Sequence, residues 1–253
     1  QGPLWIDASE QSGNLEVGLG YAYTYKPSDR TLEFAGTTNQ GDITEDVSYT
    51  YNAAITSAEW YFGWNIIGNP YPSRINAETF IDDGDNSNIY GTLYFWDENG
   101  FTGFQSEGED YAAYNLLGAT TGSGSGAVLP DQYISCGQAF FVHKTSSSPE
   151  FEDIVFTNDM REAENSYFFK DKSNEEEVLT VKLSVVNSEE MYNEIIVALK
   201  EDATNAVDNL YDGLKMQGNP LLSFYSKIGT KNYTIQALSL LNEKEYVKQV
   251  PLG

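Results

Sequence analysis

The sequence predicts an all-β fold made of two antiparallel β-sandwich modules of the jelly-roll type, with little helix. Short strand-like runs separated by turn residues fill most of the 253 residues, whereas helical periodicity is scarce. Apolar residues make up 40% of the chain and aromatic residues 14%, which is ample for a hydrophobic core. We expect the two modules at residues 1–160 and 161–253.

The first module is predicted from runs of β-branched and aromatic residues bounded by turns. One short helical turn is expected after Asn76, whose side chain is a favourable N-cap. A hairpin turn of type I′ is expected at Asn99 and Gly100, because both accept positive φ angles. The expected strands are residues 21–25, 31–34, 47–51, 61–67, 92–96, 139–143 and 154–157.

Residues 63–73, with the sequence GWNIIGNPYPS, combine a strand and a constrained turn. The Trp and Ile residues favour a half-buried strand, which the Gly-Asn-Pro sequence then ends. Pro70 and Pro72 each fix their own φ and push the preceding residue toward extended geometry, and either peptide bond is a candidate for the cis form. We interpret the segment as an architectural corner that needs no reactive group.

A change in composition marks the start of the second module. Residues 159–177 are rich in charge and Asn, and residues 178–186 then alternate as a half-buried strand with residues 194–200 as its expected partner. A short helix or a long loop is expected at residues 201–215. Further strands are expected at residues 224–225, 233–238 and 246–250, and we expect this module to be incomplete at its C-terminus.

The charge balance argues against two classes of binding partner. With 38 acidic and 14 basic side chains, the formal charge of −24 repels nucleic acid and anionic lipid head groups. The acidic residues are spread along the chain, as is typical of a solvated surface. No run of about 18 apolar residues occurs, so we expect no membrane span and no nucleic-acid partner.

The residues that usually carry catalysis are scarce. Cys136 is the single cysteine and His143 the single histidine, and no nucleophile-elbow, phosphate-loop or His-Glu zinc motif occurs. We expect Cys136 to be a small buried filler and His143 to be a strand residue on either the core or the solvent face. The sequence therefore predicts neither a catalytic residue set nor an organic cofactor, and not an enzyme.

One acidic loop is a candidate calcium site. Asp82, Asp83, Asp85 and Asn86 offer several oxygen atoms in a loop that Gly84 can bend, as hard cations require. The spacing is not that of an EF-hand, and no bidentate Glu closes the loop. An ordinary polar loop is the alternative interpretation.

Several segments together resemble a known family. In the first module these are residues 63–73, then IYGTLYFWD at 89–97, GQAFFV at 137–142 and FTNDMR at 156–161. In the second they include YDGLK at 211–215, YTIQAL at 233–238 and VPLG at 250–253. In this order they resemble the region upstream of the sorting domain in large cell-surface proteins that Bacteroidota export by the type IX secretion system.

The resemblance implies a secreted, extracellular or surface-attached protein and carries no catalytic residue set. We expect a non-catalytic structural or adhesive region of a multidomain adhesin, stalk or filament-like protein. Its expected partners are neighbouring domains of a longer chain and a glycan or other cell-surface ligand. One alternative is a carbohydrate-binding accessory module of a glycan-degrading surface enzyme, which an exposed row of aromatic side chains would favour. Another is cargo or a component bound to outer-membrane proteins of the type IX machinery.

Overall fold

The described residues of the computed structural model are 14–22, 34–49, 62–96, 111–122, 129–162, 178–188, 192–216, 222–241 and 247–253. Within them the chain is an all-β protein, as predicted, and its helical segments are α1 (Ala77–Ile81), η3 (Gly84–Asn86) and η4 (Asn158–Met160). The strands are β1 (Ile43–Ser48), β2 (Trp64–Gly68), β3 (Arg74–Asn76), β4 (Leu93–Trp96), β5 (Tyr111–Asn115), β6 (Gly118–Thr120), β7 (Tyr133–Ile134), β8 (Ala139–His143), β9 (Phe151–Phe156), β10 (Arg161–Glu162), β11 (Leu179–Val186), β12 (Tyr192–Lys200), β13 (Gly213–Leu214), β14 (Ser226–Ile228) and β15 (Lys231–Ser239).

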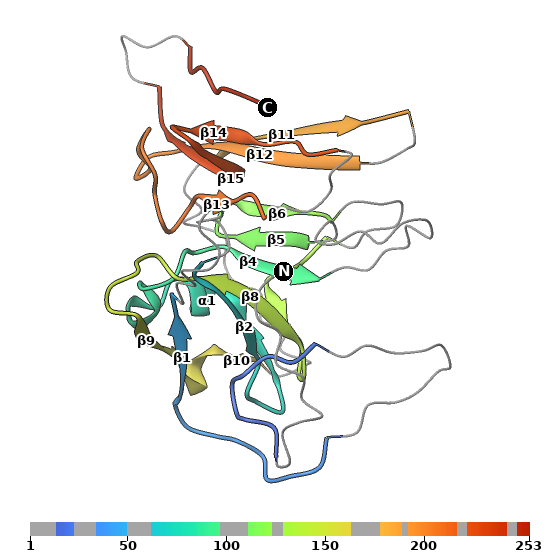
Figure 1. Cartoon of the computed structure of the whole chain (residues 1–253), viewed down its shortest axis with the longest axis vertical. Helices are drawn as coiled ribbons and strands as arrows, with labels where there is room; N and C mark the ends of the chain where they lie inside the picture. The colour runs from blue at the N-terminus through green and yellow to red at the C-terminus, as the bar shows by residue number, and fades with distance from the viewer. Residues whose placement is uncertain are drawn as a thin grey trace, which may run out of the picture.

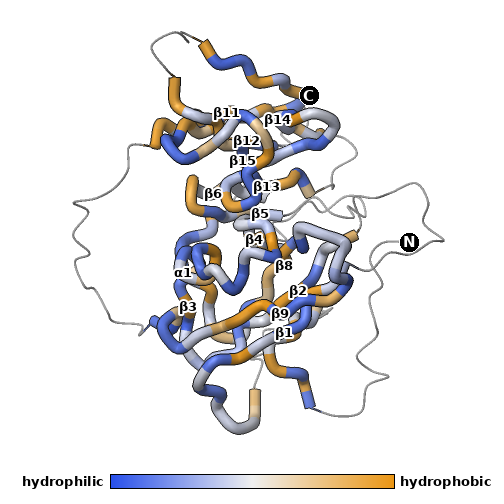
Figure 2. Tube along the Cα trace, turned by 90° about the vertical axis from the view of Figure 1, so that its left-hand side faces the viewer, coloured by the Kyte–Doolittle hydropathy of each residue, from blue (hydrophilic) through white to orange (hydrophobic). Residues whose placement is uncertain are grey.

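The described strands form four sheets. The first module contains a five-stranded sheet in the order β2-β8-β4-β5-β6, the pair β1-β9 and the small sheet β10-β3-β7. The second contains the sheet β11-β12-β15-β13, with β14 also paired to β15. Figure 1 shows the second-module sheet stacked beyond β6, at the opposite end of the molecule from β1 and β9, and Figure 2 shows the same succession after a 90° turn.

The five-stranded sheet has a hydrophobic core on each face, because successive residues of a strand point to opposite sides. Phe140 and Val142 of β8 lie in the first core, where the Phe80 ring of α1 packs 5.6 Å from that of Phe140 and 5.0 Å from that of Phe156. Phe141 lies between them in sequence and belongs to the second core.

The second core is shared by the two modules. Tyr94 and Phe141 of the first module cluster there with Ile196 and Ala198 of β12 and Ile235 of β15. The modules therefore bury apolar surface against each other in this second core, while the first core is built from residues of the first module.

Polar contacts also connect the modules. The side-chain amide of Asn115 donates to the carbonyl oxygen of Tyr211 at 2.8 Å. The hydroxyl of Tyr94 donates to the carbonyl oxygen of Leu214 at 2.7 Å. Gly91 donates its backbone N–H to Asn209 at 2.8 Å, and a Cβ at Gly91 would lie 2.3 Å from the carbonyl oxygen of Leu210. This close approach requires glycine at position 91.

Not all strand pairs are antiparallel, which corrects the expected topology. β12 and β15 pair in parallel, with Ile196 opposite Ile235. Residues 201–230 connect them and include β13 and β14, so the chain returns to the end of the sheet from which β12 began. A parallel pair needs a crossover connection of this kind.

The residues just after 160 still pair with strands of the first module. β10 pairs antiparallel with β3, so that Arg161 lies opposite Ile75 and Glu162 opposite Arg74. The first module therefore includes Glu162.

Several local predictions are confirmed. The Asn76 side chain caps α1 by accepting from the backbone N–H groups of Glu78 at 2.9 Å and Thr79 at 3.1 Å. The strand expected at residues 139–143 is β8. One expectation fails here: the peptide bonds before Pro70 and Pro72, both candidates for the cis form, are trans.

Other local predictions are wrong. Cys136 is exposed, because it lies in the turn between β7 and β8. β1 begins at Ile43 and not at the expected residue 47. The polar Glu45 lies on the same face as Ile43 and Val47, so the alternation of apolar and polar residues is not visible in the sequence. The expected strand at residues 224–225 is displaced to β14, and residues 247–250 form no strand. Residues 31–33 and the expected hairpin at Asn99 and Gly100 lie outside the described part.

Candidate binding groove

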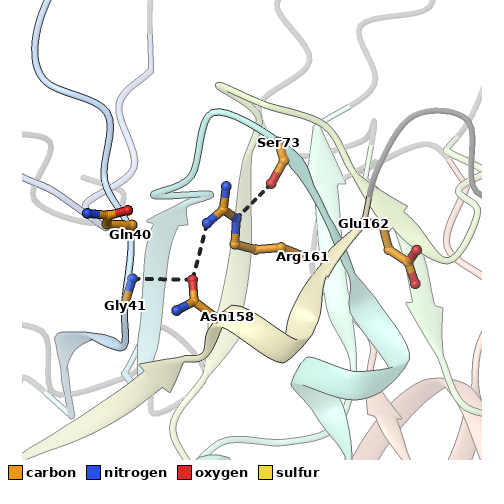
Figure 3. A pocket seen from close by; sticks show the side chains of 6 residues that line it. All are labelled: Gln40, Gly41, Ser73, Asn158, Arg161 and Glu162. Carbon is orange, nitrogen blue, oxygen red and sulfur yellow. Dashed lines mark hydrogen bonds between the residues drawn. The ribbon is translucent and has the colours of Figure 1, made fainter.

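An open groove of about 810 Å³ lies in the first module where four segments of the chain meet (Figure 3). It is formed by the segment before β1, the end of the 63–73 corner, η4 and β10. The described residues that line it are Gln40, Gly41, Ser73, Asn158, Arg161 and Glu162.

Asn69 fixes the corner that delivers Ser73 to the groove. Its side-chain Nδ2 donates to the carbonyl oxygens of Ser73 at 2.9 Å, Ile134 at 3.1 Å and Ser135 at 3.1 Å. Its Oδ1 accepts from the backbone N–H of Tyr71 at 3.0 Å. One buried amide thus ties the turn to itself and to the end of β7.

Tyr71 lies beneath the groove and joins two of its walls. Its ring is buried, and its hydroxyl donates to the carbonyl oxygens of Gly41 at 2.7 Å and Phe156 at 2.9 Å. Burial raises the pKa of the Tyr71 hydroxyl, the Asp42 carboxylate raises it further, and the Arg161 guanidinium opposes them. The hydroxyl therefore stays protonated as a structural donor.

Arg161 is the central charged group of the groove. Its guanidinium lies 5.1 Å from the centre of the Tyr71 ring, within the range of a cation–π contact. Nε donates to Ser73 Oγ at 3.2 Å and Nη1 donates to Asn158 Oδ1 at 3.2 Å, while that oxygen also accepts from the backbone N–H of Gly41 at 3.2 Å. Two neutral side chains and one ring therefore hold the guanidinium in place.

The charge of Arg161 has no acidic partner within the described residues, in contrast to other cations of the chain. Lys182 pairs with Glu194 at 3.1 Å and Lys200 pairs with Asp202 at 2.6 Å. Figure 3 shows the Glu162 side chain directed away from the Arg161 guanidinium, as expected for successive residues of a strand.

Residues 5–253 match the family model described as Domain of unknown function (DUF8693). The chain belongs to the DUF8693 family. The family match runs through both modules, as does the core that they share. No curated protein and no solved structure shows a significant match to the chain.

The candidate calcium residues of this DUF8693 chain lie elsewhere, between α1 and the strand β4. Asp82 follows the last turn of α1, and Asp83 caps η3 by accepting from the Asp85 backbone N–H at 3.0 Å. Asn86 is buried, donating to the carbonyl oxygens of Phe80 and Val155 and accepting from the Val155 N–H at 2.7 Å.

The buried side chain of Asn86 thus joins η3 to α1 and β9, whereas the three aspartates are not buried and are the accessible candidate ligands. Among the described residues, no group of three or more His, Cys, Asp or Glu side chains is arranged to hold a metal ion. The calcium site stays a prediction.

The single histidine is buried between aromatic rings. His143 is 7% exposed and makes edge contacts with the rings of Trp64 at 4.8 Å and Tyr90 at 5.3 Å. Burial, followed by the charge of Lys231, lowers the pKa of His143 to about 4, and hydrogen bonds with the backbone of Phe62 and Lys144 partly oppose this. His143 is therefore a neutral packing residue at neutral pH.

The tryptophans do not form a flat platform in the described part of the chain. Trp64 is half-buried in the shared core, where its ring is edge-on to Tyr94 at 4.9 Å. Trp96 is 50% exposed, but the Tyr111 ring meets it at 86°. Trp5 and Trp60 lie outside the described residues.

The groove is not predicted by any pattern in the sequence, although Ser73, Asn158 and Arg161 all lie within the segments that carry the family resemblance. The available signal was an arginine in a chain with 38 acidic and 14 basic residues.

Among the described helices, none is long and apolar enough to cross a membrane.

Proposed function

We propose that the chain is a non-catalytic structural region of a secreted, surface-associated multidomain protein, in which the two modules act as one rigid spacer. The surface context rests on the resemblance of the ordered sequence segments. The rigid role rests on one observation, the shared core with its polar cross-links. A spacer that transmits force between neighbouring domains benefits when its modules cannot separate easily.

The glycine at position 91 allows a direct test of the rigid spacer. A chain held between its two ends and pulled in a single-molecule experiment is expected to unfold both modules in one event. Gly91→Ala forces a methyl group against the backbone of Leu210, so we expect the second module to unfold separately and at lower force. Gly84→Ala is the matched control, because a Cβ at that position meets nothing within 4 Å.

Two separate unfolding events in the unaltered chain would exclude the rigid spacer. The surface context is tested independently with an antibody against the chain, which is expected to label intact cells of the source organism. Labelling only after lysis would exclude a surface-associated role.

Carbohydrate binding is a second candidate function, favoured by the groove. Its volume and open shape suit an oligosaccharide, and the side chains of Gln40, Ser73, Asn158 and Arg161 offer the hydrogen-bonding groups that hydroxyls require. A glycan array probed with the purified chain tests this candidate. Binding to no glycan on the array would remove it.

A further inference from the structure

We propose that the groove binds a carboxylated saccharide, a uronic acid unit of a glycan, with its carboxylate paired to Arg161. The proposal rests on the second candidate function, carbohydrate binding, and adds the class of sugar. Three features of the groove carry it: the orientation of the guanidinium, its uncompensated charge and the neutral polar groups around it.

The guanidinium is held in one orientation before any ligand arrives. Of its five N–H groups, the one on Nε and one on Nη1 are directed to Ser73 and Asn158. The other N–H group of Nη1 and both on Nη2 have no partner among the described residues. A planar fork with free N–H groups on two adjacent nitrogens matches the two oxygens of a carboxylate.

The charge of the guanidinium is also uncompensated at close range. Its hydrogen-bond acceptors are neutral, and within the described residues it takes part in no ion pair. Asp42 is exposed next to Gly41, and its field reaches Tyr71 beneath the guanidinium. Asp42 and the groove residue Glu162 weaken the attraction for an anion, but within the described residues neither forms an ion pair with Arg161.

The surroundings favour a sugar acid over a small or highly charged anion. The groove volume of about 810 Å³ is far larger than a carboxylate needs, and the amides of Gln40 and Asn158 are exposed for contact with hydroxyls. A chain of charge −24 repels free sulfate and phosphate ions, which carry close to two negative charges each, more strongly than a uronate unit, which carries one. A saccharide with one carboxylate per unit satisfies both conditions.

The test compares three probes by titration calorimetry at low salt: a galacturonate trisaccharide, its methyl ester and acetate. We expect the trisaccharide to bind at least tenfold more tightly than the other two. Arg161→Gln is expected to weaken its binding at least tenfold, and Arg161→Lys to weaken it less, because an ammonium group keeps the charge without the planar fork. Lys231→Gln removes an equal charge outside the groove and is the matched control.

Asp42→Asn provides a variant that leaves the contacts of Arg161 in place. It is expected to tighten binding of the trisaccharide at low salt and to leave binding of the ester unchanged. This outcome supports the proposal even if the variants of Arg161 fold poorly.

Equal binding of the trisaccharide and its ester, unaffected by Asp42→Asn, would overturn the carboxylate inference and leave carbohydrate binding standing. Equal affinity for acetate would show a site for small anions and also overturn it. Absence of binding to all three probes, together with an empty glycan array, would remove both the inference and the second candidate function.

Discussion

Asparagine side chains hold much of this fold together at the level of single residues. Asn65 accepts from the backbone N–H of Ser48 and donates to its carbonyl oxygen, which ties β2 to the end of β1. Asn86 and Asn115 make similar bonds to β9 and to the second module. A side-chain amide suits this role because it donates and accepts at once without adding charge.

Replacement of Asn69 tests this cross-linking role. Asn69→Ala removes the donor to three carbonyl oxygens, and buried acceptors left without partners cost about 1 to 3 kcal/mol each when fully desolvated. We expect a loss of about 2 to 4 kcal/mol in the free energy of unfolding, measured by urea titration. Asn14→Ala, at an exposed position, should change it by less than about 0.5 kcal/mol, and equal effects would refute the role.

His143 predicts a dependence of stability on pH. Its pKa is lowered to about 4 in the fold, from an ordinary value of about 6.5 for an exposed histidine. As the pH falls from about 6.5 to about 4, His143 becomes protonated in the unfolded chain but stays neutral in the folded chain. The free energy of unfolding therefore falls, by at most about 3 kcal/mol. Above that window both states are neutral at this residue and it makes no contribution.

Two carboxyls act in the opposite direction over part of the same window. Burial raises the pKa of Asp212 to about 6 and that of Glu45 to about 7, so protonation favours their folded forms as the pH falls. The contribution of His143 is therefore isolated as a difference from His143→Gln. We expect that variant to lose less stability than the unaltered chain between pH 7.5 and 4.5 in urea titrations, and parallel losses would contradict the prediction.

The groove shows the limit of prediction at this scale. Asn76 could be read as a helix cap because its bonds reach residues two and three positions away. The partners of Arg161 include Ser73, 88 positions distant in sequence. No local pattern encodes such a pair, so only the folded chain reveals that the Arg161 guanidinium faces a groove.

At the level of elements, β11 is the edge strand of the second-module sheet among the described strands. Leu179, Val181 and Leu183 lie on one face, exposed at 61%, 48% and 36%. On the other face Lys182 donates to Glu194 at 3.1 Å and to the carbonyl oxygen of Ala119 at 3.1 Å. Lys182 thus anchors the strand while its apolar face remains open to solvent.

A charge on the open face of β11 is expected to reduce self-association. Val181→Lys should change the free energy of unfolding by less than about 0.5 kcal/mol, since the position is half exposed. Exposed apolar edge strands promote aggregation, and an edge lysine opposes it. Light scattering over a concentration series is expected to show slower growth of aggregates for the variant. Unchanged growth would show that the β11 edge does not promote aggregation.

The loop after α1 carries the calcium prediction. If Asp82, Asp83 and Asp85 bind the ion, calcium at 100 times its Kd should add about 2.7 kcal/mol to the free energy of unfolding. Thermal melting with calcium and with chelator measures the effect, and Asp85→Asn should abolish it. Asp159→Asn is a control outside the loop, and identical melting curves with and without chelator would remove the site.

At the level of the whole molecule, the shared core makes the two modules depend on each other. Ile196 is 2% exposed and packs in a cluster that includes Tyr94 and Phe141 across the interface. A Cβ at Gly118 of β6 would lie 3.4 Å from its Cδ1. A substitution in β12 is therefore expected to alter side-chain packing in the first module.

Ile196→Ala tests this dependence. Replacing a buried isoleucine by alanine typically costs 2 to 5 kcal/mol, and we expect a loss in that range. Hydrogen exchange should show lower protection in β4 and β5 as well as in β12 and β15, because they share the core. Val181→Ala, on an exposed position of the same sheet, is the control, and loss of protection confined to the second module would contradict the prediction.

The all-β class, the strand at β8 and the cap at Asn76 could be predicted from the sequence, because strand alternation and capping act over a few neighbouring residues. The parallel pairing of β12 with β15, the shared core and the groove around Arg161 arise only in the folded chain. Each of these brings together residues far apart in the chain, and their proximity depends on the packing of whole sheets. The acidic composition likewise gave no sign that Arg161 would face a groove without an ion-pair partner among the described residues.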